Sequence, residues 1–414
     1  MPKKILANSF FLAASNAASS LCFFLLLIIL ARILGQEALG QYGVAMAAAA
    51  IAASLTELGL DGLAVRESSR DISQTAKYAK HSAIIRCVAG TAIFLPPLIA
   101  TIFFWQSAAA IFALMAIAYA LLRAISYSFK AAFRGHEKMQ YEAIPTTVGA
   151  VVVLLGGAIA IFFWQSIVAL GIALVVAGLV ELAIVLAYYR KKLWQKTAFD
   201  KVFAKKMLIG AAPFWLSGIL LSVYFAADIF MISFFLGDGP TGAYSAAYRP
   251  LLAMLAIAAP ISLAAYPKIS AVAHDKKKLL GTILGIYPIL LAAGIVLAIA
   301  SGGFPRELTQ ILYGAGFSQT ALVFGILWPL PILVCINFLL SATLGATNMQ
   351  GKNLAIIAIA VALNVAANYY FIQEFGIAGA AYATLLSQLL YLFFACAIIA
   401  KYILGLKNQA ARGA

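Results

Sequence analysis

The stretch Leu34-Gly35-Gln36-Glu37-Ala38-Leu39-Gly40-Gln41-Tyr42 decides how this chain folds, because it returns 202 residues later. The second copy reads Leu236-Gly237-Asp238-Gly239-Pro240-Thr241-Gly242-Ala243-Tyr244. Both copies follow the pattern L-G-x-x-x-x-G-x-Y, and each joins two long apolar runs. A polar turn repeated in this way predicts that the chain consists of two similar halves.

The composition places both halves in a membrane. Hydrophobic residues make up 64% of the chain and charged residues 10%, more apolar surface than a soluble domain can hide. A bilayer can accommodate it when the apolar residues come in runs of about 20, and they do. The four cysteines stand singly and form no CxxC pair, so neither a disulfide framework nor a metal site or cofactor is expected.

The apolar runs predict an all-α polytopic membrane protein with twelve transmembrane helices. Their approximate limits are residues 9–34, 42–58, 82–104, 108–129, 143–163, 167–189, 207–236, 243–266, 279–301, 321–344, 353–372 and 377–404. The long loop 302–320 is predicted to contain a short helix from Pro305 to Tyr313, since proline suits a first helical turn and Gly314 suits the exit. Leu308, Ile311 and Leu312 would share one face of that helix.

A second motif extends the repeat. The segment Gly135-His136-Glu137-Lys138-Met139-Gln140 matches Gly345-Ala346-Thr347-Asn348-Met349-Gln350 as G-x-x-x-M-Q, 210 residues apart. The eight extra residues can come from the long loop 302–320. Spans one to six therefore map onto spans seven to twelve as a parallel repeat, in which rocking of the two halves gives alternating access. The predicted parts are a six-helix lobe 1–189, a basic cytoplasmic linker 190–206 and a second lobe 207–414.

The basic residues orient the chain. With a cytoplasmic N-terminus, 24 of the 29 lysine and arginine residues fall on the cytoplasmic side, as the positive-inside rule requires. The net charge of +15 is thus a property of one membrane face, and no nucleic-acid partner is needed to explain it. A multi-pass protein of the cell membrane with both termini in the cytoplasm and lipids around it is expected.

Charged residues inside the apolar runs are the candidates for function, since each costs about 2.5–3.5 kcal/mol near the bilayer centre. Asp228 lies ten residues before Asp238 of the second turn, and Arg249 lies eleven residues after it. In a helical hairpin this places both at a similar depth, where they could pair. A structural ion pair and a pair that contacts a substrate or coupling ion both stay open.

The other intramembrane charges lie nearer an interface. Arg86 and Arg123 are expected to extend toward the cytoplasmic face, with Arg123 kept as a candidate for substrate binding. Arg32 serves either as an interface anchor or as part of a cavity wall. Glu57 and Glu181 could each take up a proton, but both lie close to an interface.

Taken in order, these residues resemble the polysaccharide-biosynthesis (Wzx-type) flippases, which transport lipid-linked oligosaccharides and belong to the multidrug/oligosaccharidyl-lipid/polysaccharide (MOP) exporter superfamily. The resemblance covers nearly the whole chain. Its first-half motifs are Leu30-Ala31-Arg32-Ile33-Leu34-Gly35, Gly40-Gln41-Tyr42, Leu55-Thr56-Glu57-Leu58-Gly59-Leu60-Asp61 and Val65-Arg66-Glu67. Those of the second half are Asp228-Ile229-Phe230-Met231-Ile232, Leu236-Gly237, Gly242-Ala243-Tyr244-Ser245-Ala246-Ala247-Tyr248-Arg249 and Tyr313-Gly314-Ala315-Gly316-Phe317.

The resemblance implies a two-lobed, MATE-like flippase that moves a polyprenyl-pyrophosphate-linked glycan to the outer leaflet. The first two helices of each lobe would line its cavity, which makes Arg32, Asp228 and Arg249 candidates for substrate binding. Arginine binds phosphate oxygens bidentately, while aromatic and hydroxyl groups suit a glycan, and Tyr42, Tyr224, Tyr244 and Tyr248 offer both. A coupling ion, H⁺ or Na⁺, and a glycan polymerase and glycosyltransferases are the implied partners.

Two other functions compete with this one. A drug or cation antiporter of the same fold would favour acidic residues deep in the first lobe, where the first four spans offer Glu57 alone. A membrane glycosyltransferase or polymerase would favour an acidic cluster on a large external loop. The external acids Glu37, Asp238, Glu307 and Glu374 stand on separate loops, and no phosphate-binding P-loop occurs. The sequence therefore predicts a transporter and no enzyme.

Overall fold

The computed structural model describes residues 2–195 and 197–410, which are almost entirely helical. Contacts divide the chain into two compact units, Met1–Phe230 and Met231–Ala414. Met1, Lys196 and residues 411–414, which belong to the predicted lobes and linker, lie outside the described residues. Since the unit boundary falls inside a helix that crosses from one unit to the next, the lobe limits at 189 and 207 stay a prediction.

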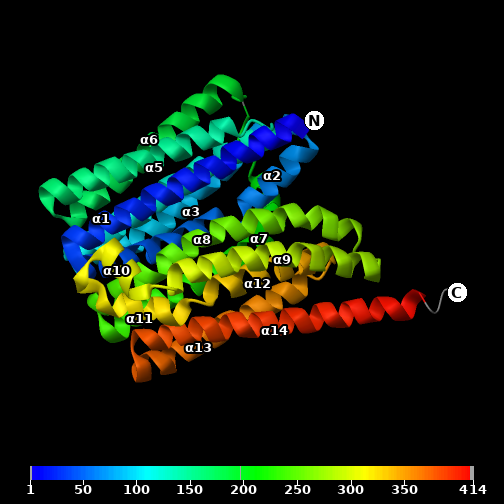
Figure 1. Ribbon diagram of the computed structural model, residues 1–414. Helices are drawn as coiled ribbons and strands as arrows, with labels where there is room; N and C mark the ends of the chain where they lie inside the picture. The colour runs from blue at the N-terminus through cyan, green and yellow to red at the C-terminus, as the bar shows by residue number, and fades with distance from the viewer. Residues whose placement is uncertain (1, 196, 411–414) are drawn as a thin grey trace. The chain divides into compact units, whose positions relative to one another are not determined.

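The first unit contains the five long helices α1, α3, α4, α5 and α6, the short helix α2 and most of α7 (Figure 1). In chain order they are α1 (Pro2–Glu57), α2 (Leu60–Arg70), the 3-10 turn η1 (Ile72–Gln74), α3 (Thr75–Phe103), α4 (Ala108–Gly135), α5 (Gln140–Ile159), the π-helical turn η2 (Ala160–Trp164), α6 (Ile167–Lys192) and α7 (Lys201–Leu236). The turns at residues 103–107 and 162–166 share the sequence FFWQS. Each ends on a serine, Ser107 or Ser166, whose side chain caps the following helix by accepting a hydrogen bond from a backbone N–H, the usual role of serine at a helix start.

The second unit begins in α7 and continues to the C-terminus (Figure 1). Its helices are α8 (Asp238–Ala271), α9 (Lys276–Gly302), α10 (Pro305–Tyr313), the 3-10 turn η3 (Ala315–Phe317), α11 (Ser318–Leu327), α12 (Leu330–Ala346), α13 (Gln350–Phe375) and α14 (Ile377–Ala410). The axes of α11 and α12 differ by 46° at a break of at most four residues. Pro329 and Pro331 explain the bend, because proline cannot continue the backbone ladder of a helix.

The helices agree with the twelve predicted spans. Within the described residues, nine helices are long and apolar enough to cross a membrane, or ten if α11 and α12 form one bent span. Residues 10–57 of α1 count there as one stretch of 48 residues, more than twice the length that crosses a hydrocarbon core of about 30 Å. Two spans in α1, together with the 34-residue α8, complete the twelve.

The two spans of α1 run in opposite directions. The first runs parallel to α5, since Ser15 bonds to the Ala143 carbonyl and Leu26 lies beside Gly157 further along both helices. The second runs parallel to α4, since Tyr42 stacks on Phe112, and Ala52 and Leu121 belong to one hydrophobic cluster further along both helices. Because α4 and α5 are consecutive helices joined by a tight turn, they are antiparallel, and the chain must reverse between the two spans of α1.

The reversal occurs at Gly35, the second residue of the repeated nonapeptide. Its backbone has φ 81° and ψ −171°, and Gly237, at the same place in the second copy, has φ 86° and ψ −174°. This region of backbone space is open essentially to glycine alone. The two copies therefore adopt one conformation, and the repeat seen in the sequence is a repeat of structure.

Replacing Gly35 by alanine is expected to lower the free energy of unfolding by about 1–3 kcal/mol, the cost of holding such a backbone with a Cβ atom. No atom lies within 4 Å of the place a Cβ would occupy, so the cost comes from the backbone and not from a clash. Gly281→Ala in α9 is the control, since its site is equally open and its φ is ordinary; it should be neutral or slightly stabilising. Equal effects of the two substitutions in a denaturant titration would contradict the explanation.

The second repeated motif also has one structure in both halves. The turn after α4 has a left-handed residue at Glu137 (φ 54°), and the turn after α12 has one at Asn348 (φ 60°). In each turn an N–H bonds back five residues, Lys138 to Phe133 at 2.9 Å and Met349 to Leu344 at 2.8 Å. This closure is the Schellman motif that ends helices.

The predicted short helix in the long loop is confirmed. Helix α10 spans Pro305–Tyr313 and ends at Gly314 with φ 90°. Its buried residues are Thr309 and Tyr313, whereas Ile311 is exposed. The Tyr313 hydroxyl donates to the carbonyl of Ala246 in α8 at 2.9 Å, and burial raises the pKa of Tyr313. Through this hydrogen bond the helix face that carries Thr309 and Tyr313 packs against α8.

The connection from α6 to α7 is attached to α3. The backbone N–H of Asp200 donates to Nε2 of His81 at 2.9 Å, and Lys80 donates to the carbonyl of Thr197. The Asp200 carboxylate accepts bonds from the N–H groups of Phe203 and Val202 at the start of α7, and these bonds hold the pKa of Asp200 below its usual range. The described part of the predicted linker, residues 190–195 and 197–206, thus belongs to the first unit.

Candidate functional site

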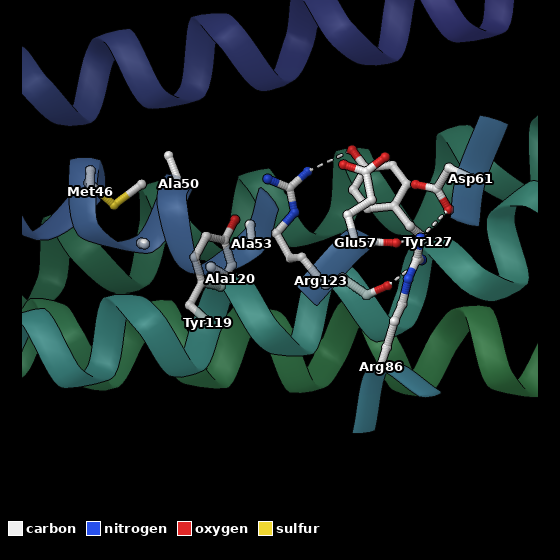
Figure 2. Close-up of a pocket in the computed structure, with 12 residues that line it drawn as sticks. Met46, Ala50, Ala53, Glu57, Asp61, Arg86, Tyr119, Ala120, Arg123 and Tyr127 are labelled. Atoms are coloured by element: carbon white, nitrogen blue, oxygen red, sulfur yellow. Dashed lines mark hydrogen bonds and ion pairs between the residues drawn. The ribbon is translucent and has the colours of Figure 1, made fainter. Parts of the chain in front are cut away.

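A cavity of about 390 Å³ lies within the first unit. One wall is a single face of α1, whose residues recur every three or four positions, namely Met46, Ala49, Ala50, Ala53 and Glu57. The opposite wall is a face of α4 with the same spacing, formed by Tyr119, Ala120, Arg123, Ala124 and Tyr127. Small side chains on both faces leave room between helices that otherwise pack closely. Asp61 of α2 and Arg86 of α3 complete the lining (Figure 2).

Arg86 is fully buried at the edge of this cavity. Its guanidinium donates to Oδ1 of Asp61 at 2.6 Å and to the carbonyl of Ala124 at 2.8 Å, and Figure 2 shows it reaching Asp61. Arg86 therefore does not reach solvent, and its depth relative to the cytoplasmic face stays a prediction. Asp61 and the backbone of α4 supply the partners that a buried cation needs.

A second charged group lies behind the α4 wall. Glu181 of α6 is fully buried, with Lys130 bonded to one carboxylate oxygen and Arg123 Nε 3.3 Å from the other. Lys130 is itself fully buried and donates to Thr146 Oγ1 at 2.7 Å. Glu181 thus shares its charge with two cations inside the unit, one of which is Arg123. How near Glu181 and Arg123 lie to a membrane interface stays a prediction.

The charges in and around the cavity balance. Arg134 pairs with Glu142 next to these groups. The cations are Arg86, Arg123, Lys130 and Arg134, and the carboxylates are Glu57, Asp61, Glu142 and Glu181. Balanced charge is what allows so many ionisable groups to be buried, because an unpaired buried charge is costly.

Arg123 and Glu57 differ from the other charged residues here in keeping unused bonding capacity. The Arg123 side chain is 27% exposed, and its only described hydrogen bond is a long one of 3.5 Å to the Tyr127 hydroxyl. Within the described residues, the Glu57 carboxylate makes no hydrogen bond or ion pair. In Figure 2 both side chains line the cavity.

The remaining residues predicted for the substrate site in the first unit are not among those that line this cavity. Arg32 is exposed three residues before the reversal at Gly35. Tyr42 is buried and stacks on Phe112, with 6.1 Å between ring centres. Asp228 is buried in α7.

The other predicted residues belong to the second unit. Tyr244 and Tyr248 are buried in α8 with ring centres 5.2 Å apart, and the Tyr244 hydroxyl lies 3.3 Å from Thr384 Oγ1. Arg249 follows them and is half-buried. Because Asp228 and Arg249 fall in different units, their pairing stays a prediction.

Sequence reasoning missed Tyr119, Tyr127, Glu57 and Lys130 as members of one site. The sequence does predict part of the site, because Tyr119, Arg123 and Tyr127 are spaced four residues apart and must share one face of a helix. The pairs Arg86–Asp61 and Lys130–Glu181 join distant segments and carry no local signal. Within the described residues, no group of His, Cys, Asp or Glu side chains is arranged to hold a metal ion.

Comparison with known proteins adds the family. The model of the polysaccharide biosynthesis protein family matches residues 5–273, well over half of the chain and all of the cavity described above. The chain belongs to the polysaccharide biosynthesis protein family. A curated relative, the probable flippase AglR of Haloferax volcanii, is 26% identical over 207 residues, which are 48% of this chain and 43% of AglR. The chain thus spans less than half the length of that relative.

Solved structures show which fold this family member has. A multidrug-resistance MATE transporter of the MOP superfamily in an inward-facing conformation aligns with a TM-score of 0.79 and 17% identity, covering 94% of this chain and 96% of that one. The lipid II flippase MurJ in an inward closed conformation aligns with a TM-score of 0.74 and 15% identity, covering 97% and 90%. The all-α, twelve-helix, MATE-like fold predicted from the sequence is confirmed, and the protein is a multi-pass membrane protein.

Proposed function

We propose that this protein is a flippase that moves a polyprenyl-pyrophosphate-linked oligosaccharide or polysaccharide repeat unit from the cytoplasmic to the outer leaflet by alternating access. The observation that carries the proposal is membership of the polysaccharide biosynthesis protein family over residues 5–273. A transporter fold and a polar cavity inside an apolar protein suit that task, because a glycan needs hydrogen-bonding groups throughout its path. The work is transport without covalent chemistry, and the protein is no enzyme.

The proposal assigns the charged and aromatic candidate residues to different parts of the substrate. Arg32, Asp228 and Arg249, with Tyr42, Tyr244 and Tyr248, belong to the first two spans of each lobe and are assigned to the substrate. The arginines would hold the pyrophosphate, since the guanidinium fork matches phosphate oxygens. Arg123 is assigned to the substrate as well. Its partly exposed side chain lines the cavity within the first unit, which supports this assignment.

The same proposal covers location and partners. The protein is placed in the cell membrane with both termini in the cytoplasm, where the basic residues concentrate. Membrane lipids surround it, and H⁺ or Na⁺ is the proposed coupling ion. Glycosyltransferases supply the lipid-linked glycan on the cytoplasmic side, and a polymerase uses it on the other.

A MATE-like drug or cation antiporter is the second candidate. The observation that favours it is the Glu57 carboxylate, which lies in the cavity without a described partner and could bind a cation. The other lining carboxylate, Asp61, is already neutralised by Arg86 at 2.6 Å. An antiporter would protect cells against cationic dyes or drugs, and Glu57→Gln would abolish that protection.

Deleting the gene is expected to remove the exported glycan from the cell surface and to leave its lipid-linked precursor in the membrane, because synthesis continues on the cytoplasmic side. Mass spectrometry of extracted lipids and staining of surface glycan check the two outcomes. A cell with normal surface glycan and no accumulated precursor, but new sensitivity to cationic drugs, would support the antiporter instead.

A further inference from the structure

The cavity within the first unit has no net charge and therefore does not suit the pyrophosphate. Its four charged lining residues are Glu57, Asp61, Arg86 and Arg123, two of each sign, and the pair Arg86–Asp61 is closed at 2.6 Å. Lys130 and Glu181 behind the wall also offset each other. A phosphate group entering this space would add negative charge beside Glu57, with no surplus cation to offset it. The occupant should therefore carry no net charge.

The unused hydrogen-bonding groups fit a ligand rich in hydroxyls. The Glu57 carboxylate can only accept, and the Arg123 guanidinium can only donate. Glu57 has no described partner, and Arg123 has one long bond to Tyr127 at 3.5 Å. A hydroxyl both donates and accepts, so neighbouring hydroxyls can satisfy a carboxylate and a guanidinium at the same time. Such pairing adds no charge to the cavity.

The rest of the lining also suits a sugar ring. Tyr119 and Tyr127 stand one turn before and one turn after Arg123, with ring centres 5.6 Å and 5.8 Å from its guanidinium carbon. Aromatic rings of this kind offer an apolar surface with a polar tip. The volume of about 390 Å³ lies within the range of roughly 300–1,000 Å³ found for small-molecule sites.

We propose that this cavity binds a neutral sugar residue of the lipid-linked glycan, with Glu57 accepting from its hydroxyls and Arg123 donating to them. The inference rests on the proposed function. It specifies that this cavity recognises the sugar part of the substrate. The pyrophosphate would be held elsewhere, by the arginines Arg32 and Arg249. Glu57 is then a determinant of specificity for the glycan.

The test uses two lipids that share the pyrophosphate and the polyprenyl chain and differ in the sugar. One probe is the lipid-linked glycan that accumulates in the deletion strain, and the other is sugar-free polyprenyl pyrophosphate. Binding to the full-length protein in lipid nanodiscs is measured for both. Glu57→Ala is expected to weaken binding of the glycan lipid about tenfold or more, since it removes hydrogen bonds to a charged group, and to leave binding of polyprenyl pyrophosphate unchanged.

Two further variants separate this role from a general effect. Glu37→Gln removes an exposed carboxylate from the same helix outside the cavity and should change neither affinity. Ala53→Leu fills the cavity without altering charge and should weaken the glycan lipid alone. Equal weakening of both lipids by Glu57→Ala, or none, would overturn the sugar site. Failure of the unaltered protein to bind the glycan lipid would instead overturn the proposed function.

Discussion

Replacing Glu181 by glutamine is expected to lower the free energy of unfolding by about 3–5 kcal/mol, the cost of stripping the partner from a buried charge. Lys130 would be left fully buried, with the Thr146 hydroxyl and the ring of Tyr127 as its remaining described partners and no carboxylate to balance its charge. The space around Glu181 is built for the carboxylate, since a Cβ at Gly149 would lie 2.8 Å from Glu181 Oε2. The measurement is unfolding of the purified protein in mixed micelles.

The control for this prediction removes both charges. Glu181→Leu combined with Lys130→Met takes out the buried pair together, and such replacements are often neutral or stabilising. Arg123 loses its partner in that variant, but its side chain is 27% exposed to the cavity and can be hydrated there. A double variant as unstable as the single one would contradict the claim that the uncompensated Lys130 causes the loss.

The second large effect concerns transport. Arg249→Ala is expected to abolish glycan export while the protein remains in the membrane at its normal level. A charge near the bilayer centre costs about 2.5–3.5 kcal/mol, and the proposal assigns Arg249 to the pyrophosphate, whose negative charge would offset it. Surface glycan and protein level in the complemented deletion strain are the two readouts.

Two variants distinguish a substrate role from a structural one. Arg306→Ala removes an exposed arginine in α10 and should leave export unchanged. If Asp228 and Arg249 only neutralise each other, the variant Asp228→Asn/Arg249→Gln should export nearly normally. If Arg249 contacts the pyrophosphate, the double variant should fail like Arg249→Ala. Normal export by Arg249→Ala itself would remove Arg249 from the site.

The sequence predicted the parts of the fold that local chemistry determines. The nonapeptide repeat led to the reversals at Gly35 and Gly237, because only glycine takes up their backbone conformation. The start of α10 at Pro305 and its end before Gly314 followed from the same kind of local rule. These features need no knowledge of what packs against them.

The site could be predicted only in part, because its contacts join distant segments. Lys130 directly follows the predicted span 108–129, yet α4 continues to Gly135, and Lys130 pairs with the buried Glu181 of α6. Arg86 likewise has a partner, Asp61, on a separate helix. The position of a charged residue along its own helix does not reveal its partner, because the partner lies on another helix.

Movement of the glycan lipid between leaflets by the purified protein tests the central claim most directly. Liposomes are prepared with the glycan lipid from the deletion strain, and a glycan-cleaving enzyme that cannot cross the membrane is added outside. With the protein present, the account predicts that glycans of the inner leaflet also become accessible and that nearly the whole pool is cleaved. Cleavage confined to the outer leaflet, in the presence and absence of an H⁺ or Na⁺ gradient, would contradict it.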